Sequence, residues 1–217
     1  MSKILIMAEA GVNHNGSLAI AKRLADMAKK AGADIVKYQT FVPEALVSQF
    51  AQKAEYQQKN DPNSESQLDM LRKLALSNED FVELRDYCNK IGIKFLSTPF
   101  DFPSIDFLDS IGMDMWKIPS GEITNMPYLI KIAKTGKPVI LSTGMSNVND
   151  VENAVRILKD NGCGDISILH CTTQYPAPVE YINLKAMDTL RKKFGCKVGL
   201  SDHSLGIEVS IAAAALG

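Results

Sequence analysis

The sequence predicts an α/β protein of the (β/α)8 TIM barrel class, with only about seven βα units present. Two observations lead to this prediction: short apolar runs alternate with longer segments of helical period, and polar residues follow almost every apolar run. Repeated βα units imply parallel strands joined by right-handed crossovers. In a barrel every strand delivers functional groups at its carboxyl end, whereas an open sheet concentrates them at one switch point. The distribution of polar residues therefore favours the barrel.

Seven apolar runs have the length and composition of buried strands. They lie at residues 4–8, 35–38, 94–96, 113–117, 139–141, 166–169 and 198–200. Segments of amphipathic helical period lie at residues 18–31, 78–91, 103–111, 127–135, 148–161, 184–194 and 207–216. Glycines stand where several of these helices should end, and Asn78 and Asn147 can cap helix starts. This punctuation supports the boundaries.

The expected domain is a single synthase-type barrel over residues 1–217 that lacks the eighth strand. A complete barrel needs eight strands and about 250 residues, and the sequence ends after its seventh expected helix. A longer parent protein or another segment would then close the sheet. Residues 41–75 interrupt the βα rhythm with a long polar stretch. Long loops on barrels often act as lids, and a plain surface excursion is the open alternative.

Composition excludes several classes of protein. Of the 217 residues, 46% are hydrophobic and 23% charged, and the net charge is -1. A balanced charge does not favour nucleic acid or an anionic membrane as a partner. The longest apolar runs are far shorter than the ~20 residues of a membrane helix, and no leader resembles a signal peptide. We expect a cytoplasmic protein whose four scattered cysteines are reduced thiols.

Two nucleotide-binding motifs are absent. Residues 11–17, GVNHNGS, have the spacing of a phosphate loop, but Gly16 stands where the essential lysine would be. No GxGxxG follows the first expected strand, so a dinucleotide fingerprint is also missing. Glu9, in contrast, comes at the end of an apolar run. A carboxylate in that place is costly unless it is paired or used, which favours a functional role over a structural ion pair.

Two lysines at strand ends, Lys37 and Lys117, allow two kinds of chemistry. Each could form a Schiff base, as in a class I aldolase, or bind an anion. Lys117 is followed by Ile-Pro-Ser-Gly-Glu, and hydroxyls or glycine-adjacent amides recur at Thr98, at residues 142–144 and at Ser201. Such a donor-rich set suits a phosphorylated and carboxylated anion. His203, in contrast, does not make a metal site alone, because divalent metals commonly need two or more protein ligands.

With these residues collected, the chain resembles the sialic acid synthase family, whose bacterial members make N-acetylneuraminate, legionaminate and related nonulosonic acids. Seven ordered motifs carry the resemblance along the whole chain. They are AEAGVNHNG (8–16), VKYQTF (36–41), FLSTPFD (95–101), WKIPSGEITN (116–125), PVILSTGMS (138–146), LHCTTQYPAP (169–178) and GLSDHSLG (199–206).

The resemblance implies an enzyme that condenses phosphoenolpyruvate with an open-chain N-acetylmannosamine-type sugar, adds water and releases phosphate. It implies a divalent metal, Mn2+ or Mg2+, that polarises the aldehyde as a Lewis acid, with His203 as one metal ligand. It places the remaining residues in two groups. Those expected to hold phosphoenolpyruvate are Lys37, Thr98, Lys117, Ser120, Ser142 and Ser201. Those expected near the sugar and the reacting atoms are Glu9, Gln39, Glu122 and Tyr175, with Glu9 transferring a proton or orienting water.

The chain also departs from the family pattern. The second metal histidine would lie shortly after Gly217, and the C-terminal antifreeze-like domain, which reaches the partner's active site in family dimers, is absent. The full-length protein is expected to be a homodimer. The HCTT form and the AEY and ESQ signals between residues 54 and 67 lean toward the legionaminate branch, with plain N-acetylmannosamine as the alternative. A non-catalytic barrel fragment that serves as a binding or assembly module, and a Schiff-base aldolase, remain the competing functions.

Overall fold

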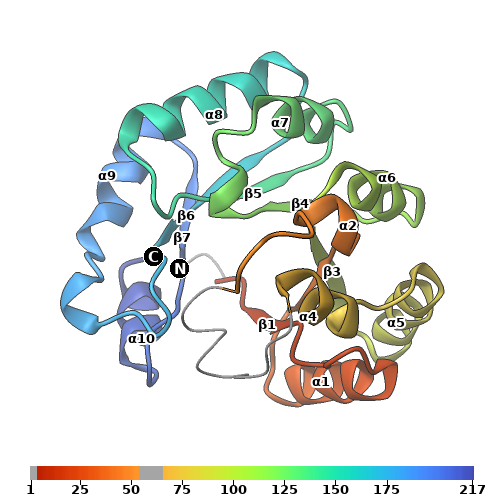
Figure 1. The fold of residues 1–217 in the computed structure, drawn as a ribbon. Coiled ribbons are helices and arrows are strands. Elements are labelled where there is room, and N and C mark those ends of the chain that lie inside the picture. The colour runs from red at the N-terminus through yellow and green to blue at the C-terminus, as the bar shows by residue number, and fades with distance from the viewer. Residues whose placement is uncertain (1–3, 54–65) are drawn as a thin grey trace. The chain divides into compact units, whose positions relative to one another are not determined.

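The computed structural model describes residues 4–53 and 66–217. The chain divides into two compact units, and each is described by itself. The N-terminal unit is Leu5–Met113, and the C-terminal unit is Asp114–Gly217 together with Ile4. In each unit, strands that pair in parallel alternate with helices (Figure 1). The predicted βα repeat is therefore observed, with seven strands in the described residues.

The N-terminal unit contains a three-stranded sheet in the order β1-β2-β3. The strands are β1 (Met7–Gly11), β2 (Ile35–Thr40) and β3 (Lys94–Pro99). The helices are α1 (Leu18–Lys30), α2 (Pro43–Leu46), α4 (Gln67–Leu74), α5 (Asn78–Ile91) and α6 (Phe102–Ser110). Helix α1 packs closely because Ala21 and Ala25 are fully buried small residues, and the Tyr38 hydroxyl donates to the Ala21 carbonyl at 2.9 Å.

The C-terminal unit contains a four-stranded sheet in the order β4-β5-β6-β7. The strands are β4 (Trp116–Ile118), β5 (Val139–Ser142), β6 (Ile166–Cys171) and β7 (Lys197–Ser201). The helices are α7 (Met126–Ala133), α8 (Val148–Asp160), α9 (Lys185–Phe194) and α10 (Glu208–Ala215), with short 3-10 turns η1 (Ser120–Glu122) and η2 (Val179–Tyr181). Trp116 is fully buried, and its indole Nε1 donates to the Thr135 hydroxyl at 2.8 Å.

The first strand begins later than the apolar run predicts. The sequence pattern places it at residues 4–8, but Ile4, Leu5 and Ile6 are exposed and the ladder begins where Met7 pairs with Ile35. The Ile6 amide instead donates to the Asp34 carboxylate at 3.0 Å. Apolar residues indicate the segment in which a strand forms, but they do not set where it begins. A strand begins where its backbone can pair with a partner strand, and β2 begins only at Ile35. As a result, Glu9 lies inside β1 rather than beyond its end.

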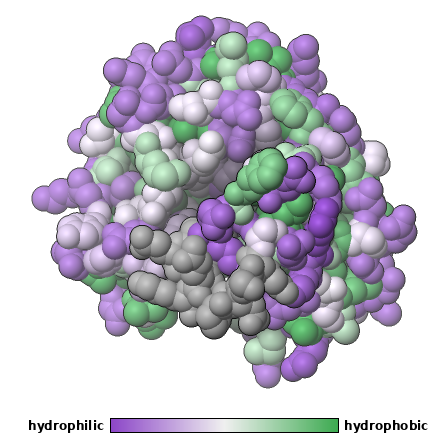
Figure 2. All heavy atoms as spheres, viewed as in Figure 1, coloured by the Kyte–Doolittle hydropathy of each residue, from purple (hydrophilic) through white to green (hydrophobic). Residues whose placement is uncertain are grey.

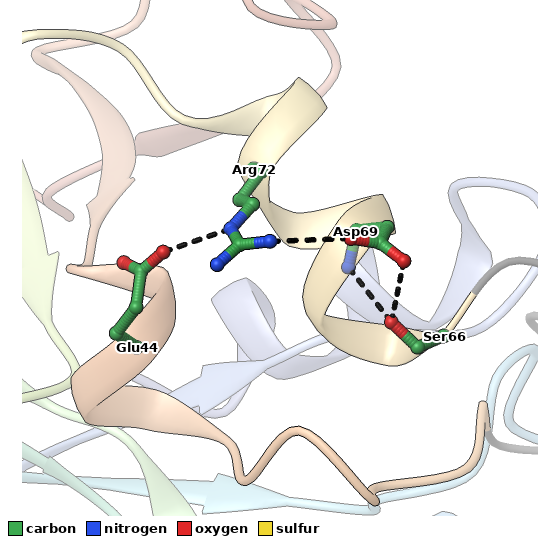
Figure 3. A network of polar contacts seen from close by, with 4 residues as sticks. All are labelled: Glu44, Ser66, Asp69 and Arg72. Atoms are coloured by element: carbon green, nitrogen blue, oxygen red, sulfur yellow. Dashed lines mark hydrogen bonds and ion pairs between the residues drawn. The ribbon is translucent and has the colours of Figure 1, made fainter.

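The long polar segment between β2 and α5 contains helices that the sequence pattern did not indicate. Helix α2 follows β2 closely, and α4 precedes α5. Arg72 of α4 joins them, since its guanidinium lies 2.8 Å from Glu44 of α2 and 3.3 Å from Asp69 (Figure 3). Asp69 also accepts the Ser66 hydroxyl at 2.8 Å. Residues 54–65, which hold the AEY signal, lie outside the described residues.

Much of the face drawn in Figure 2 is hydrophilic. Figure 2 shows hydrophilic residues along α5 and α8, with hydrophobic residues scattered between them. Among the helices in the described part of the chain, none is both long and apolar enough to cross a membrane.

Helix α8 begins at a well-formed cap. The Asn147 side chain accepts the amides of Asn149 and Asp150, and the Asp150 carboxylate accepts the Asn147 amide, which is a capping box. These contacts satisfy amides that an α-helix leaves unpaired at its start. Because α8 directly follows the loop after β5, the cap also fixes where that loop ends.

Removing this cap should lower stability measurably. We expect Asn147→Ala to reduce the free energy of unfolding by about 1 kcal/mol, because the side chain satisfies two amides. Urea denaturation followed by circular dichroism measures the change. Asn149→Ala, two residues later in the first turn of α8, is the matched control: it keeps the backbone amide that Asn147 accepts and should change stability by less than half as much. Equal losses of stability in the two variants would contradict the assignment of the Asn147 side chain as the cap of α8.

Candidate active site

Four of the predicted site residues share one face of the N-terminal sheet. Glu9 pairs with Lys37 in parallel, just before the register of β1 shifts between Glu9 and Gly11, and Gln39 pairs with Thr98 in a continuous parallel register between β2 and β3. Side chains alternate between the faces of a strand, so Lys37 and Gln39 lie on one face of β2 while Tyr38 lies on the other, against α1. In-register pairing then brings Glu9 and Thr98 to the face of Lys37 and Gln39.

On this face, Glu9 and Lys37 form an ion pair between Oε2 and Nζ. The Lys37 side chain is mostly buried, whereas the Glu9 side chain is about half exposed. Gly11 gives the carboxylate its room: a Cβ on Gly11 would stand 3.1 Å from Glu9 Oε1 and 3.6 Å from Gln39 Nε2, and its φ of +51° disfavours any other residue. The carboxylate, the ammonium and the amide are therefore held close together.

Thr98 contributes a hydroxyl with no partner among the described residues. Its side chain is buried and Oγ1 has no hydrogen bond there. An unpaired buried polar atom costs about 1–3 kcal/mol, and such atoms are uncommon in folded proteins. The neighbouring Ser97, on the opposite face, is paired with Thr40 at 2.6 Å. The hydroxyl of Thr98 is thus available to a bound molecule on the face of Lys37.

The C-terminal sheet has a second polar face. Lys117 pairs with Ile140 and Cys171 with Ser201, and the register continues across all four strands. Two-residue alternation places four side chains on the same face: Lys117, Ser142, Cys171 and Ser201. The opposite face carries Trp116, Ile118, Leu141 and Ile168, all fully buried. One face is thus an apolar core and the other carries cationic, hydroxyl and thiol groups.

Lys117 is the buried cation of this face. Its Nζ donates to the Ser142 hydroxyl at 2.7 Å and to the Ile118 carbonyl at 2.9 Å. A buried charge needs such hydrogen bonds to compensate for lost hydration. The Ser142 oxygen accepts from the ammonium, so its own hydrogen points elsewhere and can donate to an anion. Lysine and hydroxyl together form a preassembled anion-binding pair.

The loops after β4 and β5 are joined at Ser120. The Gly144 amide donates to Ser120 Oγ at 2.9 Å. A Cβ on Gly144 would stand 2.4 Å from Thr173 Cγ2, 2.9 Å from Ser120 Oγ and 3.2 Å from Cys171 Sγ. Only glycine fits at this junction. Glu122, in η1, accepts the Asn125 side-chain amide at 2.6 Å and is held at the start of α7.

His203 and Tyr175 lie together beyond β6 and β7. Their ring centroids are 4.4 Å apart at 48°. His203 Nδ1 lies 2.9 Å from the Thr172 carbonyl and 3.9 Å from Cys171 Sγ. The His203 carbonyl accepts the Ala177 amide at 2.8 Å. The two loops that the sequence placed at neighbouring strand ends therefore contact each other through this histidine.

The surroundings of this pair raise the pKa of His203 and lower the pKa of Cys171. Burial alone would raise the pKa of Cys171, but hydrogen bonds to His203, Ser120 and Ser201 lower it on balance. The Cys171 contact and the Thr172 carbonyl raise the pKa of His203 against the opposing effect of burial. By contrast, burial raises the pKa of Cys88 to about 12, so that thiol stays protonated.

The chemistry of His203 fits a metal ligand. A histidine that binds a metal through Nε2 commonly donates its Nδ1 hydrogen to a carbonyl, and the Thr172 carbonyl takes that place here. Within the described residues, no group of three or more His, Cys, Asp and Glu side chains is assembled as a metal site. His203 is therefore one fitting ligand, and water or substrate oxygens would supply others.

The other two histidines are arranged differently. His14 is fully buried, its Nδ1 accepts the Gly16 amide at 3.1 Å, and burial lowers its pKa. His170 alternates with Cys171 and so lies on the helix-facing side of β6, where burial lowers its pKa. The sequence analysis assigned no role to Cys171 or Asp202. The feature of the sequence that could have indicated them is their position next to His170 and His203 at the ends of two expected strands.

Comparison with known proteins identifies the family. A sequence profile described as the NeuB family matches residues 24–217. The chain belongs to the NeuB family. This bears out the resemblance to sialic acid synthases.

NeuB relatives of known name support the same conclusion. The chain is 52% identical over its full length to the N,N'-diacetyllegionaminic acid synthase of Campylobacter jejuni, and 50% identical over 98% of its length to that of Legionella pneumophila. It spans 66% and 61% of the lengths of these two relatives.

A solved NeuB-type structure confirms the fold class. The crystal structure of an N-acetylneuraminic acid (sialic acid) synthetase from Leptospira borgpetersenii, in complex with citrate, matches with a TM-score of 0.87 and 32% identity. The match covers 100% of this chain and 70% of that one. The predicted α/β barrel fold with parallel strands is therefore confirmed, and the chain contributes seven βα units to it within the described residues.

The junction at Gly144 gives a testable result. Gly144→Ala should lower the free energy of unfolding by about 1–3 kcal/mol, because the new methyl group would collide with Thr173 and Ser120. Chemical denaturation measures the loss. Gly121→Ala is the matched control, since no atom lies within 4 Å of a Cβ at that site. If Gly144→Ala were as stable as the control, the close packing of these loops would be refuted.

Proposed function

We propose that the chain belongs to a nonulosonic acid synthase that condenses phosphoenolpyruvate with an open-chain, N-acetylated amino sugar and releases phosphate. The observation that carries this proposal is the buried Lys117 ammonium, which donates to the Ser142 hydroxyl on a face that also carries Cys171 and Ser201. Phosphoenolpyruvate carries both a phosphate and a carboxylate, and this cluster is built from groups that bind anions. Membership in the NeuB family supports the same reaction.

The C-terminal cluster is proposed to bind phosphoenolpyruvate. Lys117 supplies a positive charge, and the hydroxyls of Ser120, Ser142 and Ser201 supply neutral donors. The Ser120 oxygen already accepts the Gly144 amide, so its hydrogen is directed away from that contact. Because the Lys117 side chain is buried, its charge is little screened and acts strongly on a bound anion. These donor groups are therefore already in place, and little rearrangement of the protein is needed when the anion binds.

The N-terminal cluster is proposed to contribute to binding and proton transfer. Lys37 and Thr98 are assigned to the anion, and the unpaired buried Thr98 hydroxyl supports this assignment. Glu9, ion-paired with Lys37, is assigned to proton transfer or to orienting water. Gln39, Glu122 and Tyr175 are assigned to the sugar. Their amide, carboxylate and phenol groups match the hydroxyls and amides of such a substrate.

The proposed reaction balances as follows. The C2=C3 double bond of phosphoenolpyruvate supplies the electron pair with which C3 bonds to the aldehyde carbon, and the aldehyde oxygen takes a proton. Water adds its oxygen to C2 and gives up one proton, for which a carboxylate such as Glu9 is a suitable acceptor and which replaces the proton taken by the aldehyde oxygen. The bond between C2 and the bridging phosphate oxygen then breaks, the second water proton is lost as the C2 ketone forms, and inorganic phosphate leaves with that proton. The product is a 2-keto acid three carbons longer than the sugar.

We also propose that His203 helps to hold a divalent metal, Mn2+ or Mg2+. When bound, that ion would supply Lewis acidity toward the aldehyde oxygen. The protein's own contribution is to fix the imidazole through the Thr172 carbonyl and the Tyr175 ring.

The sugar is proposed to be of the diacetamido, legionaminate-forming type. Relatives at 52% and 50% identity are named N,N'-diacetyllegionaminic acid synthases, whereas N-acetylneuraminate-9-phosphate synthases from human and mouse are 35% and 34% identical. Plain N-acetylmannosamine is the competing substrate.

Further assignments rest on this chemistry rather than on geometry. We propose a cytoplasmic location, where phosphoenolpyruvate is produced, a single barrel domain over residues 1–217, and a homodimer of the full-length protein. The Schiff-base aldolase alternative is disfavoured, because Lys117 Nζ is held by the Ser142 hydroxyl and the Ile118 carbonyl, and Lys37 Nζ is ion-paired with Glu9. These contacts occupy the nitrogen that would have to attack a carbonyl carbon.

Phosphorus NMR tests the proposed reaction. With phosphoenolpyruvate, Mg2+ and a diacetamido or N-acetylmannosamine substrate, the inorganic phosphate signal should grow, and Lys117→Met should abolish this growth. Lys134→Met, the same substitution at an exposed site, is the control and should behave as wild type. A phosphoenolpyruvate signal that is perturbed but not consumed would favour the binding-module alternative. A signal unchanged by the protein would contradict the proposed site.

Metal removal tests the metal separately. With a chelator present, phosphate release should stop, while the perturbation of the phosphoenolpyruvate signal should persist because Lys117 and Ser142 do not depend on a metal for their contact. Added Mn2+ or Mg2+ in excess should restore turnover. Phosphate release that continues equally well in the chelator would rule out the metal.

A further inference from the structure

The turn after β7 is organised by the carboxylate of Asp202, a residue outside the proposed binding and catalytic groups. Asp202 Oδ1 accepts the Ser204 amide at 2.9 Å and the Ser204 hydroxyl at 2.7 Å. Its Oδ2 accepts the Ser210 hydroxyl, on α10, at 2.6 Å. These hydrogen bonds tie residues 202–204 into a local turn and tie that turn to the helix. Both oxygens of Asp202 are engaged, Oδ1 by Ser204 and Oδ2 by Ser210 of α10, and His203 is the residue between Asp202 and Ser204.

His203 is held from the other side by the loop after β6. Its carbonyl accepts the Ala177 amide at 2.8 Å, and its ring lies against Tyr175. Neither contact would fix the imidazole if the backbone of residues 202–204 could turn. The Asp202 hydrogen bonds remove that freedom. The imidazole orientation is thus determined jointly by the two loops, and Asp202 anchors one of them.

The contact at Nδ1 determines the tautomer. The Thr172 carbonyl, 2.9 Å away, can only accept, so the hydrogen of the neutral ring must be on Nδ1. The lone pair is then on Nε2, the atom left to bind a metal. The hydrogen bond made by one ring nitrogen sets the role of the other. A histidine that loses such a partner returns to a mixture of tautomers in which Nε2 carries the hydrogen in most molecules.

We propose that Asp202 is a positioning residue, which holds the turn so that His203 keeps its Nδ1 hydrogen on the Thr172 carbonyl and presents the Nε2 lone pair to a divalent cation. The part that concerns the cation rests on the proposed function. The part that concerns the tautomer does not, because it follows from contacts within this chain. Asp202 does not touch the reacting atoms in this proposal and acts only through His203.

The experiment compares wild type with Asp202→Ala by two-bond proton–nitrogen NMR of the imidazole rings, at a pH where they are neutral. The chain has three histidines, and His203→Gln identifies the signals of His203. Wild type should show the hydrogen on Nδ1, and Asp202→Ala should shift the ring toward the Nε2–H form. Electron paramagnetic resonance of free Mn2+ should show a loss of affinity of about 10-fold or more in Asp202→Ala, the effect typical of a lost outer-shell partner.

Two control variants separate positioning from general damage. Asp202→Asn should largely restore the wild-type tautomer and Mn2+ affinity, since its oxygen can accept from Ser204 and its NH2 group can donate to Ser210. Asp188→Asn removes a carboxylate that is paired with Arg191 on α9, and it should change neither measurement. Should Asp202→Ala fail to fold, Ser210→Ala, which removes a single hydrogen bond, takes its place and should shift the tautomer part of the way.

Three results would overturn the proposal. They are a wild-type ring with its hydrogen on Nε2, an unchanged tautomer in a folded Asp202→Ala, and an Asp202→Asn variant as impaired as Asp202→Ala. If wild type shows the Nδ1–H form and Asp202→Ala loses it, but neither binds Mn2+, Asp202 is confirmed as the positioning residue and the metal part of the proposed function fails. The two ideas are therefore tested independently.

Discussion

The register of the parallel strands is the constraint on which both polar clusters depend. Lys117 pairs with Ile140 in β5, so Ser142 falls two residues further along the same face and within 2.7 Å of Nζ. A slip of β5 by one residue would place Leu141 beside the ammonium and Ser142 among the helices. The same holds in the N-terminal unit, where the pairing of Glu9 with Lys37 sets their ion pair. The large apolar side chains of the opposite faces, Trp116 and Tyr38 among them, make such a slip very costly.

The polar faces depart from the local rules that the rest of the chain follows. Lys117 is buried, Thr98 Oγ1 has no hydrogen-bond partner in the described residues, and Met145 has φ of +58° next to Gly144. Each feature costs free energy that the opposite, well-packed faces offset. Departures of this kind are expected where a protein is shaped to bind another molecule. They are concentrated at the carboxyl ends of β3, β4 and β5, where the sequence placed its candidate residues.

Much of the fold could be predicted from the sequence, because apolar runs and helix-ending glycines mark βα units directly. The strand boundaries could not be predicted, since a ladder begins only where both partner strands are present, as Met7 and Ile35 illustrate.

The sequence also identified Lys117, Ser142 and His203 as strand-end residues, and their motifs matched one family. It did not reveal which groups touch. The contact of Cys171 with His203 depends on how two loops, about 30 residues apart in the chain, fold onto each other. The contacts of Asp202 depend on how the turn after β7 folds against α10. Helices α2 and α4 were also missed, because α2 has only four residues and α4, although it buries Leu68 and Leu71, has only eight residues in a largely polar segment.

The burial of Trp116 has a consequence for any spectroscopic study of this protein. It is the single tryptophan of the chain, it lies in β4 of the C-terminal unit, and its indole is shielded from water and hydrogen-bonded to Thr135. Its emission should therefore be blue-shifted in the native protein and should report on the C-terminal unit alone. The N-terminal unit, which carries Glu9, Lys37 and Thr98, contains no tryptophan and does not contribute to that emission. An intrinsic fluorescence melt would describe one half of the chain, and its agreement with a backbone signal would reveal whether the two halves unfold together.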